Sequence, residues 1–158
     1  NILAAVSIGL HFGLNQDQIK QGIESYEPQT LRSQIIQKEH NKIFLDAYNA
    51  NPSSMELSIK NFLAMPGNDK ILCLGDMFEL GIYEEEEHQN IVDYCQNSGL
   101  KDVILVGKAF AKTNINYRKF EQTQDLAAFF TANPPLQKFI FLKGSRGMKL
   151  ESLVENIS

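Results

Sequence analysis

The residues best suited to chemistry lie in four polar stretches, each of which follows a short apolar run. They are "DAYNANPSS" (46–54), "GDMFELG" (75–81), "GKAF" (107–110) and "KGSRG" (143–147). Carboxylates and amides can hold hydroxyl groups, while cationic side chains and free backbone N–H groups at a helix start bind anions. These stretches therefore indicate a site for an anionic, hydrogen-bonding ligand.

The first stretch leads into a helix. Pro52 suits the first helical position, where its missing N–H is not needed, and Asn51 is then the N-cap. The backbone N–H groups of Ser53 and Ser54 are expected to point out of this helix end, where an anion would bind. An ordinary capped helix start explains the same residues without a ligand.

Other groups in these stretches could contact a ligand directly. Asp46 could accept ribose hydroxyls or hold a metal-bound water, and Tyr48 could stack or form a hydrogen bond. Arg146, between Gly144 and Gly147, can bind a carboxylate through two parallel hydrogen bonds. A strand-end acid and a solvated turn are the alternatives.

Acidic residues are concentrated between positions 76 and 87. Asp76 and Glu79 could orient a substrate ammonium or a water, although two exposed loop acids explain them equally well. The run 84–87 is simpler to interpret as a negative first helical turn. His88 follows it, and a packed or capping histidine is favoured over a catalytic one.

The composition limits the class of protein. Lys and Arg number 15 against 19 Asp and Glu, for a net charge of −4, so no basic surplus favours nucleic acid. No apolar run of membrane-spanning length and no signal-peptide pattern occurs. Cys73 and Cys95 lack metal-binding spacing and are predicted to be buried free thiols in a reducing compartment.

Four apolar runs predict buried strands at 43–45, 71–74, 103–106 and 139–142. Helical patterns alternate with them, around residues 55–63, 88–95, 126–130 and 148–154. This alternation predicts an α/β, Rossmann-like, mostly parallel sheet with helices on both faces. Residues 33–46 predict an antiparallel hairpin that opens the sheet, with its turn near His40 and Asn41.

Residues 1–28 differ from the rest. They predict two helices, the second capped by Asn15, and a domain boundary at 28–30. The chain begins with Asn1 and runs at once into an apolar segment, which suggests a piece of a longer protein. Residues 1–28 are thus expected to be the end of a preceding domain, and residues 29–158 a second domain.

Three stretches, in this order, resemble the C-terminal part of the Mur ligase family: "DAYNANPSSM", "LGDMFELG" with His88 downstream, and "KGSRGMKLE". "YNANP" and "KGSR" are similar to the branch that joins D-alanyl-D-alanine to UDP-N-acetylmuramoyl-tripeptide. The resemblance covers about residues 1–155. It implies a cytoplasmic ligase of peptidoglycan precursor synthesis, and with it a role in cell wall biogenesis, cell shape and cell division.

The resemblance also implies a mechanism and a domain plan. ATP, with Mg²⁺, converts the substrate carboxylate to an acyl phosphate, which the incoming amine attacks. Such ligases have three domains, and the last one closes over the other two. Residues 1–28 would be the terminal helices of the central ATPase domain. Partners would be the chain's own N-terminal and central domains and the small-molecule substrates, in a monomer.

The resemblance implies two groups of site residues. The nucleotide side is expected to comprise Arg32, Asp46, Tyr48, Asn49 and Asn51. The D-alanyl-D-alanine side is expected to comprise Asp76, Glu79, Lys143, Gly144, Ser145 and Arg146. Arg146 is expected to bind the terminal carboxylate. No catalytic residue and no metal ligand is assigned within this chain.

This sequence departs from the family pattern most in lacking a phosphate-binding loop, because neither GxGxxG nor GxxxxGK[ST] occurs. Most of the ATP and Mg²⁺ contacts would then lie outside it, and the chain alone is not expected to ligate. Two alternatives remain. One is a non-catalytic α/β module that binds a nucleotide or another anion. The other is a sister amino-acid ligase, such as a folate-type glutamate ligase.

Overall fold

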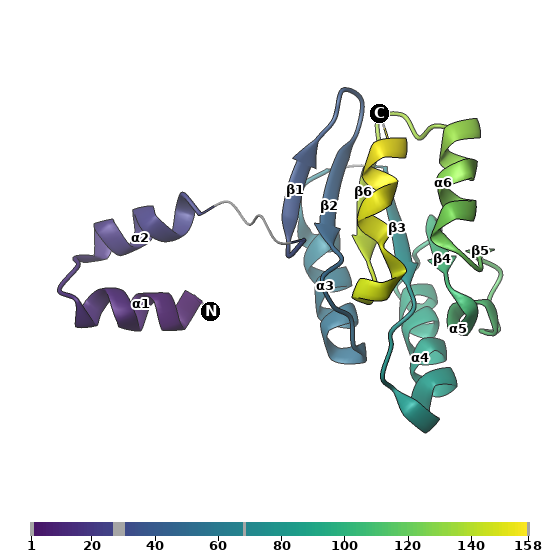
Figure 1. Ribbon diagram of the computed structural model, residues 1–158, viewed down its shortest axis with the longest axis horizontal. Helices are drawn as coiled ribbons and strands as arrows, with labels where there is room; N and C mark the ends of the chain where they lie inside the picture. The colour runs from purple at the N-terminus through teal and green to yellow at the C-terminus, as the bar shows by residue number, and fades with distance from the viewer. Residues whose placement is uncertain (1, 27–30, 68, 158) are drawn as a thin grey trace.

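The computed structural model describes residues 2–26, 31–67 and 69–157. Its centre is one sheet of six strands in the order β1-β2-β6-β3-β4-β5 (Figure 1). The strands are β1 Gln34–Gln37, β2 Lys42–Asp46, β3 Lys70–Gly75, β4 Val103–Val106, β5 Arg118–Phe120 and β6 Phe139–Lys143. β1 and β2 are antiparallel and the other neighbours are parallel, which confirms the expected α/β sheet and its opening hairpin.

Helices follow most strands. The α-helices are α1 Ile2–His11, α2 Gln16–Glu24, α3 Pro52–Ala64, α4 Glu84–Asn97, α5 Lys108–Ala111 and α6 Thr123–Ala132. Three short 3₁₀ helices are η1 Gly81–Tyr83, η2 Arg146–Met148 and η3 Leu150–Asn156. The expected C-terminal helix is therefore present, in 3₁₀ rather than α form.

Side chains alternate along the central strands and build two apolar layers. Phe44 packs with Phe62 of α3 and with Phe141, whereas Ile43 and Leu45 face η3 and α6 on the other side. Figure 1 shows α3 and α4 on one face of the sheet and η3 on the other. Because both faces are covered, the strands are continuous apolar runs, as predicted.

β5 was not among the predicted strands. It consists of Arg118, Lys119 and Phe120, of which Arg118 is exposed and the other two are half-buried. It pairs with β4 at the edge of the sheet. An edge strand needs only one apolar face, so its sequence lacks the continuous apolar run that marks the central strands.

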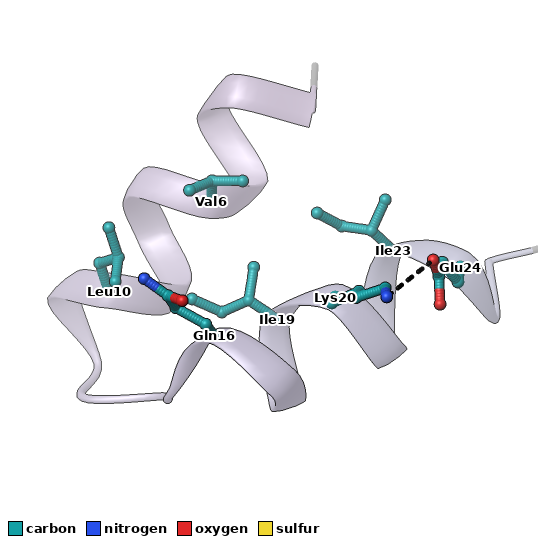
Figure 2. A pocket seen from close by; sticks show the side chains of 7 residues that line it. All are labelled: Val6, Leu10, Gln16, Ile19, Lys20, Ile23 and Glu24. Atoms are coloured by element: carbon teal, nitrogen blue, oxygen red, sulfur yellow. Dashed lines mark ion pairs between the residues drawn. The ribbon is translucent and has the colours of Figure 1, made fainter.

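The first two helices pack on each other, and Figure 1 shows them to one side of the sheet. Asn15 caps α2 as predicted, in a capping box with Gln18. Between the helices lies a cavity of about 440 Å³, lined by Val6, Leu10, Gln16, Ile19, Lys20, Ile23 and Glu24 (Figure 2). The expected domain boundary at 28–30 lies outside the described residues.

No helix among the described residues is both long enough and apolar enough to cross a membrane. Cys73 and Cys95 are buried free thiols, as predicted. Burial raises the pKa of Cys95 to about 12 and raises that of Cys73 still further above the ordinary thiol range.

Candidate functional site

Three of the polar stretches meet at the carboxyl edge of the sheet, because β6 lies between β2 and β3. Lys143, the last residue of β6, is in register with Asp46 of β2 and with Leu74 of β3. In open α/β sheets ligands bind beyond the carboxyl ends of the strands, where the strand order reverses. The loops that follow β2, β3 and β6 therefore form the candidate site.

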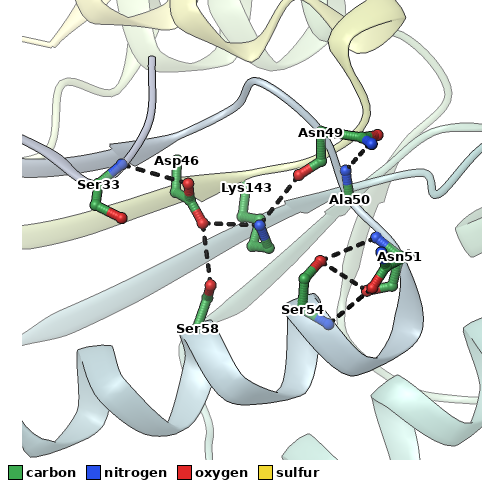
Figure 3. A network of polar contacts seen from close by, with 8 residues as sticks. All are labelled: Ser33, Asp46, Asn49, Ala50, Asn51, Ser54, Ser58 and Lys143. Carbon is green, nitrogen blue, oxygen red and sulfur yellow. Dashed lines mark hydrogen bonds and ion pairs between the residues drawn. The ribbon is translucent and has the colours of Figure 1, made fainter. Parts of the chain in front are cut away.

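A buried ion pair joins two of these loops. Lys143 Nζ lies 2.7 Å from Asp46 Oδ2, and the Lys143 side chain is only 3% exposed. The same ammonium donates to the backbone carbonyl of Asn49 at 3.2 Å. Ser58 Oγ and the Ser33 N–H also donate to the Asp46 carboxylate (Figure 3). Asp46 thus connects β6, α3 and the segment before β1.

Ser33 and Ser58 were not predicted as members of this network. Ser58 lies 12 residues from Asp46 and Ser33 lies 13. The sequence does not indicate whether a polar residue on a helix has a hydrogen-bond partner in another element. Only the packing of α3 on β2 shows that Ser58 belongs to this network. The prediction that Lys143 lies on the D-alanyl-D-alanine side of the site stays a prediction. In the structure its ammonium points inward and donates to Asp46.

The start of α3 is capped as predicted. Asn51 is the N-cap, with Pro52 at the first helical position, and its side chain accepts from Ser54 N at 2.9 Å. The expectation that the Ser54 N–H is spare for an anion is therefore wrong. Asn49 Oδ1 likewise accepts from the N–H of Ala50 at 2.9 Å. Local side chains can satisfy donors at a helix start, as Asn51 does for the Ser54 N–H. The expectation for the Ser53 N–H stays a prediction.

Arg32 and Tyr48, both expected on the nucleotide side, lie against each other. The Arg32 guanidinium is 3.9 Å from the centre of the Tyr48 ring. Both residues are exposed, and Tyr48 retains 44% of its accessible surface. A guanidinium on an aromatic face forms a cation–π contact that still leaves N–H donors for an anion. The pair is thus a cationic and aromatic surface beside Asp46.

Asp76 is buried and makes structural hydrogen bonds. Its two carboxylate oxygens accept from the N–H groups of Ala109 and Phe110, each at 2.9 Å, at the start of α5. Gly107 has φ +124°, and a Cβ there would lie 2.1 Å from the Asp76 carboxyl carbon. Asp76 therefore holds α5 against β3, and its interpretation as an exposed loop acid is wrong.

His88 is fully buried and is a packed histidine, as favoured from the sequence. Its Nε2 accepts from the N–H of Met77 at 3.0 Å, and its Nδ1 lies 2.6 Å from the carbonyl of Glu84. Nδ1 therefore carries the proton, and the 3.7 Å separation from Asp76 Oδ1 is not an ion pair. His88 fixes the loop after β3 to the first turn of α4.

The loops after β3 and β6 are bonded to each other. Ser145 is buried: its Oγ accepts from Phe78 N at 2.8 Å, and its N–H donates to Asp76 O at 3.0 Å. A Cβ on Gly144 would lie 2.9 Å from Gly75 Cα. The glycines therefore allow the two backbones to touch, and the two hydrogen-bonded loops form one wall of the site.

Arg146 and Glu79 project from this wall into solvent. The Arg146 side chain is 60% exposed and lies 3.9 Å from the Glu151 carboxylate, a loose contact. Glu79 is exposed and has φ +65°. At this wall the side chains of Arg146 and Glu79 are open to a ligand, whereas those of Asp76, Lys143 and Ser145 are buried.

Residues 31–146, which include all of these loops, match the family described as Mur ligase, glutamate ligase domain. The chain belongs to the Mur ligase family. The curated UDP-N-acetylmuramoyl-tripeptide--D-alanyl-D-alanine ligase of Buchnera aphidicola (from Acyrthosiphon pisum) is 34% identical over 164 residues, covering 99% of this chain and 36% of the relative.

Solved Mur ligases share the fold. A crystal structure of MurF from Acinetobacter baumannii is 25% identical, with a TM-score of 0.81 over 99% of this chain and 36% of that one. MurF from Thermotoga maritima in complex with ADP is 22% identical, with a TM-score of 0.76, covering 96% of this chain and 35% of that one. This chain thus spans about a third of the length of these Mur ligases.

Proposed function

We propose that this chain is the C-terminal domain of an ATP-dependent ligase that joins D-alanyl-D-alanine to UDP-N-acetylmuramoyl-tripeptide in peptidoglycan precursor synthesis. The observation that carries the proposal is the 34% identity to a curated ligase of that name across 99% of this chain. The convergence of the three motif-bearing loops at one edge of the sheet supports it.

The geometry supports a division of labour within the site. Arg32 and Tyr48 would face the nucleotide, with the guanidinium toward phosphate and the ring toward the sugar or base. Asp46 accepts three hydrogen bonds, and a carboxylate can accept about four, so it could also accept from a ribose hydroxyl. Arg146 would bind the terminal carboxylate of D-alanyl-D-alanine through two parallel hydrogen bonds.

ATP with Mg²⁺ would supply the phosphoryl group that activates the substrate carboxylate. Among residues 2–26, 31–67 and 69–157, no group of three or more His, Cys, Asp or Glu is placed to hold a metal ion. We propose, from the resemblance to the family, that Mg²⁺ and most phosphate contacts belong to the central domain. This chain would contribute orientation of the nucleotide and of the second amino substrate.

We propose that α1 and α2 are the last helices of that central domain. Their exposed apolar side chains support this, since Leu3 is 83% and Phe12 76% exposed. Apolar surface of this kind on a helical pair is typical of a missing packing partner. The full protein would act as a monomer in the cytoplasm, with its own N-terminal and central domains as partners.

The experiment that tests the proposal uses the full-length protein and this chain side by side. Full-length protein with ATP, Mg²⁺, UDP-N-acetylmuramoyl-tripeptide and D-alanyl-D-alanine should release phosphate, and the chain alone should not. L-Glutamate should not replace the dipeptide. Phosphate release with glutamate would favour a sister ligase, and no release with any amine would favour a non-catalytic binding module.

A further inference from the structure

The buried ammonium of Lys143 is oriented for a different role from the one expected for it. The residue is 2% exposed, and its Nζ is directed at Asp46 Oδ2 and at the carbonyl of Asn49. A lysine is costly to bury unless its charge is paired and its protons are bonded. Figure 3 shows the Lys143 ammonium between these two acceptors, with a dashed line to each.

The two acceptors of Lys143 lie on either side of Tyr48 in the sequence. The ammonium therefore ties down the backbone before and after the residue that stacks on Arg32. The same Asp46 carboxylate receives the N–H of Ser33, which follows Arg32. Both members of the Arg32–Tyr48 surface are thus held through a single carboxylate that Lys143 pairs.

We propose that Lys143 is a positioning residue for the nucleotide side of the site, acting through Asp46 and the Asn49 carbonyl rather than touching D-alanyl-D-alanine. This rests on the proposed function. The wall that carries Arg146 is bonded through Ser145 to Phe78 and Asp76, independently of the Lys143 side chain. Loss of the ammonium should therefore disturb the nucleotide side and leave the dipeptide side in place.

The test is the Lys143→Met variant of the full-length enzyme, in which an unbranched apolar chain replaces the lysine. The KM for ATP should rise about 10-fold or more, while the KM for D-alanyl-D-alanine should change less than about 2-fold. Titration calorimetry with ATP alone should give the same loss of affinity without turnover. Lys101→Met, at an exposed position near the opposite end of β4, is the matched control and should change neither value.

A second comparison distinguishes a positioning role of Lys143 from a loss of folding. It is needed because Lys143→Met leaves the partly buried Asp46 carboxylate without its charge partner. The double variant Asp46→Asn/Lys143→Met leaves neither a lone carboxylate nor a lone ammonium, whereas Asp46→Asn alone leaves the Lys143 ammonium bonded to the Asn49 carbonyl without its charge partner. If Lys143 acts largely through Asp46, the fold-loss of ATP affinity in the double variant should be clearly smaller than the product of the two single losses. Thermal unfolding of every variant comes first, and kinetics are measured only below the transition.

The outcomes are distinct. A raised dipeptide KM with unchanged ATP affinity would mean that Lys143 contacts the second substrate, and it would overturn the inference. Strictly additive effects of the two substitutions on ATP affinity would overturn it as well. If the wild-type protein binds ATP but does not ligate D-alanyl-D-alanine, the proposed function fails while the ATP titration still decides the inference. A wild-type protein that binds no ATP would overturn both.

Discussion

At the scale of residues, polar side chains at the carboxyl edge of the sheet fall into two kinds. Asp46, Asp76 and Lys143 are bonded within the protein, whereas Arg146 and Tyr48 are exposed. Sequence motifs do not distinguish the two kinds, because both occur at strand ends. Burial does distinguish them: a buried charge needs an internal partner, and an exposed one remains available to a ligand.

Arg146→Gln should raise the KM for D-alanyl-D-alanine about 10- to 100-fold in the full-length enzyme, since it removes a charge-assisted hydrogen bond of about 1.5–3 kcal/mol. Stability should change by less than about 0.5 kcal/mol, because the side chain is mostly exposed. Steady-state kinetics and thermal unfolding measure the two effects. Arg118→Gln, on the edge strand β5, is the control, and an equal rise in KM there would count against the assignment.

The two cysteines should resist thiol reagents while the protein is folded. Burial raises the pKa of Cys95 to about 12 and that of Cys73 further, so both are neutral thiols at pH 8. We expect almost no reaction with a chromogenic disulfide at pH 8 in buffer, and reaction of both thiols in guanidinium chloride. Rapid labelling of a thiol under native conditions would show that the core opens locally.

The same pKa difference predicts a dependence of stability on pH. A folded-state pKa above the unfolded value of about 8.5 stabilises the fold below that pH, and the contribution is lost as pH rises toward the folded pKa. The free energy of unfolding should therefore fall above pH 9, by up to about 1.4 kcal/mol per pH unit for each thiol. Denaturant titrations between pH 7 and 10.5 measure it, and Cys95→Ala should flatten the slope.

At the scale of elements, one side chain can hold a whole segment in place. α5 has only four residues, too few to be stable alone, and Asp76 accepts the N–H groups of Ala109 and Phe110 in its first turn. Gly107 precedes it with a backbone angle that favours glycine and no room for a side chain. The position of α5 therefore depends on Asp76, which follows β3, and on the space that Gly107 leaves for its carboxylate.

Gly107→Ala should destabilise this chain by about 3 kcal/mol or more, because the new methyl group displaces the Asp76 carboxylate and the backbone angle is strained. Gly99→Ala is the matched control: its φ is also positive, at +72°, but no atom lies within 4 Å of the added Cβ. It should cost about 1–2 kcal/mol. Equal losses in denaturant titrations would mean that contact with Asp76 is unimportant.

At the scale of the whole molecule, the sheet and its covering helices are complete without α1 and α2. Both apolar layers are built from residues after position 30, within the described part of the chain. The helical pair instead exposes large apolar side chains, including Leu3 and Phe12. The two apolar layers of the sheet thus use no side chain of α1 or α2 among the described residues, which agrees with the proposal that the helical pair belongs to a preceding domain.

A chain of residues 31–158 should fold alone, with a free energy of unfolding within about 0.5 kcal/mol of the full 158-residue value, because its apolar layers are intact. It should also aggregate less, since the exposed apolar helices are gone. Circular dichroism, denaturant titration and light scattering measure these effects. Loss of cooperative unfolding on truncation would place the domain boundary elsewhere.

The sequence by itself determined the class of fold, because central strands covered on both faces must be apolar throughout, and those runs alternate with helical patterns. It also determined local features whose partners lie within one turn, such as the caps of Asn15 and Asn51. β5 was not predicted because it has only three residues, Arg118, Lys119 and Phe120, and no apolar run. The motif resemblance indicated the family, which the match over residues 31–146 then established.

Only the tertiary structure decided which polar residues are free. The partners of Lys143 lie 97 and 94 residues away in sequence, and those of Asp76 lie 33 and 34 away. The Lys143 pairs form because β6 inserts between β2 and β3, and the Asp76 pairs form because β4 lies on the other side of β3. No local pattern in the sequence records this strand order. A buried charged group is stable only with an internal partner. The exposed side chains of the site have no such requirement and remain available to bind a ligand.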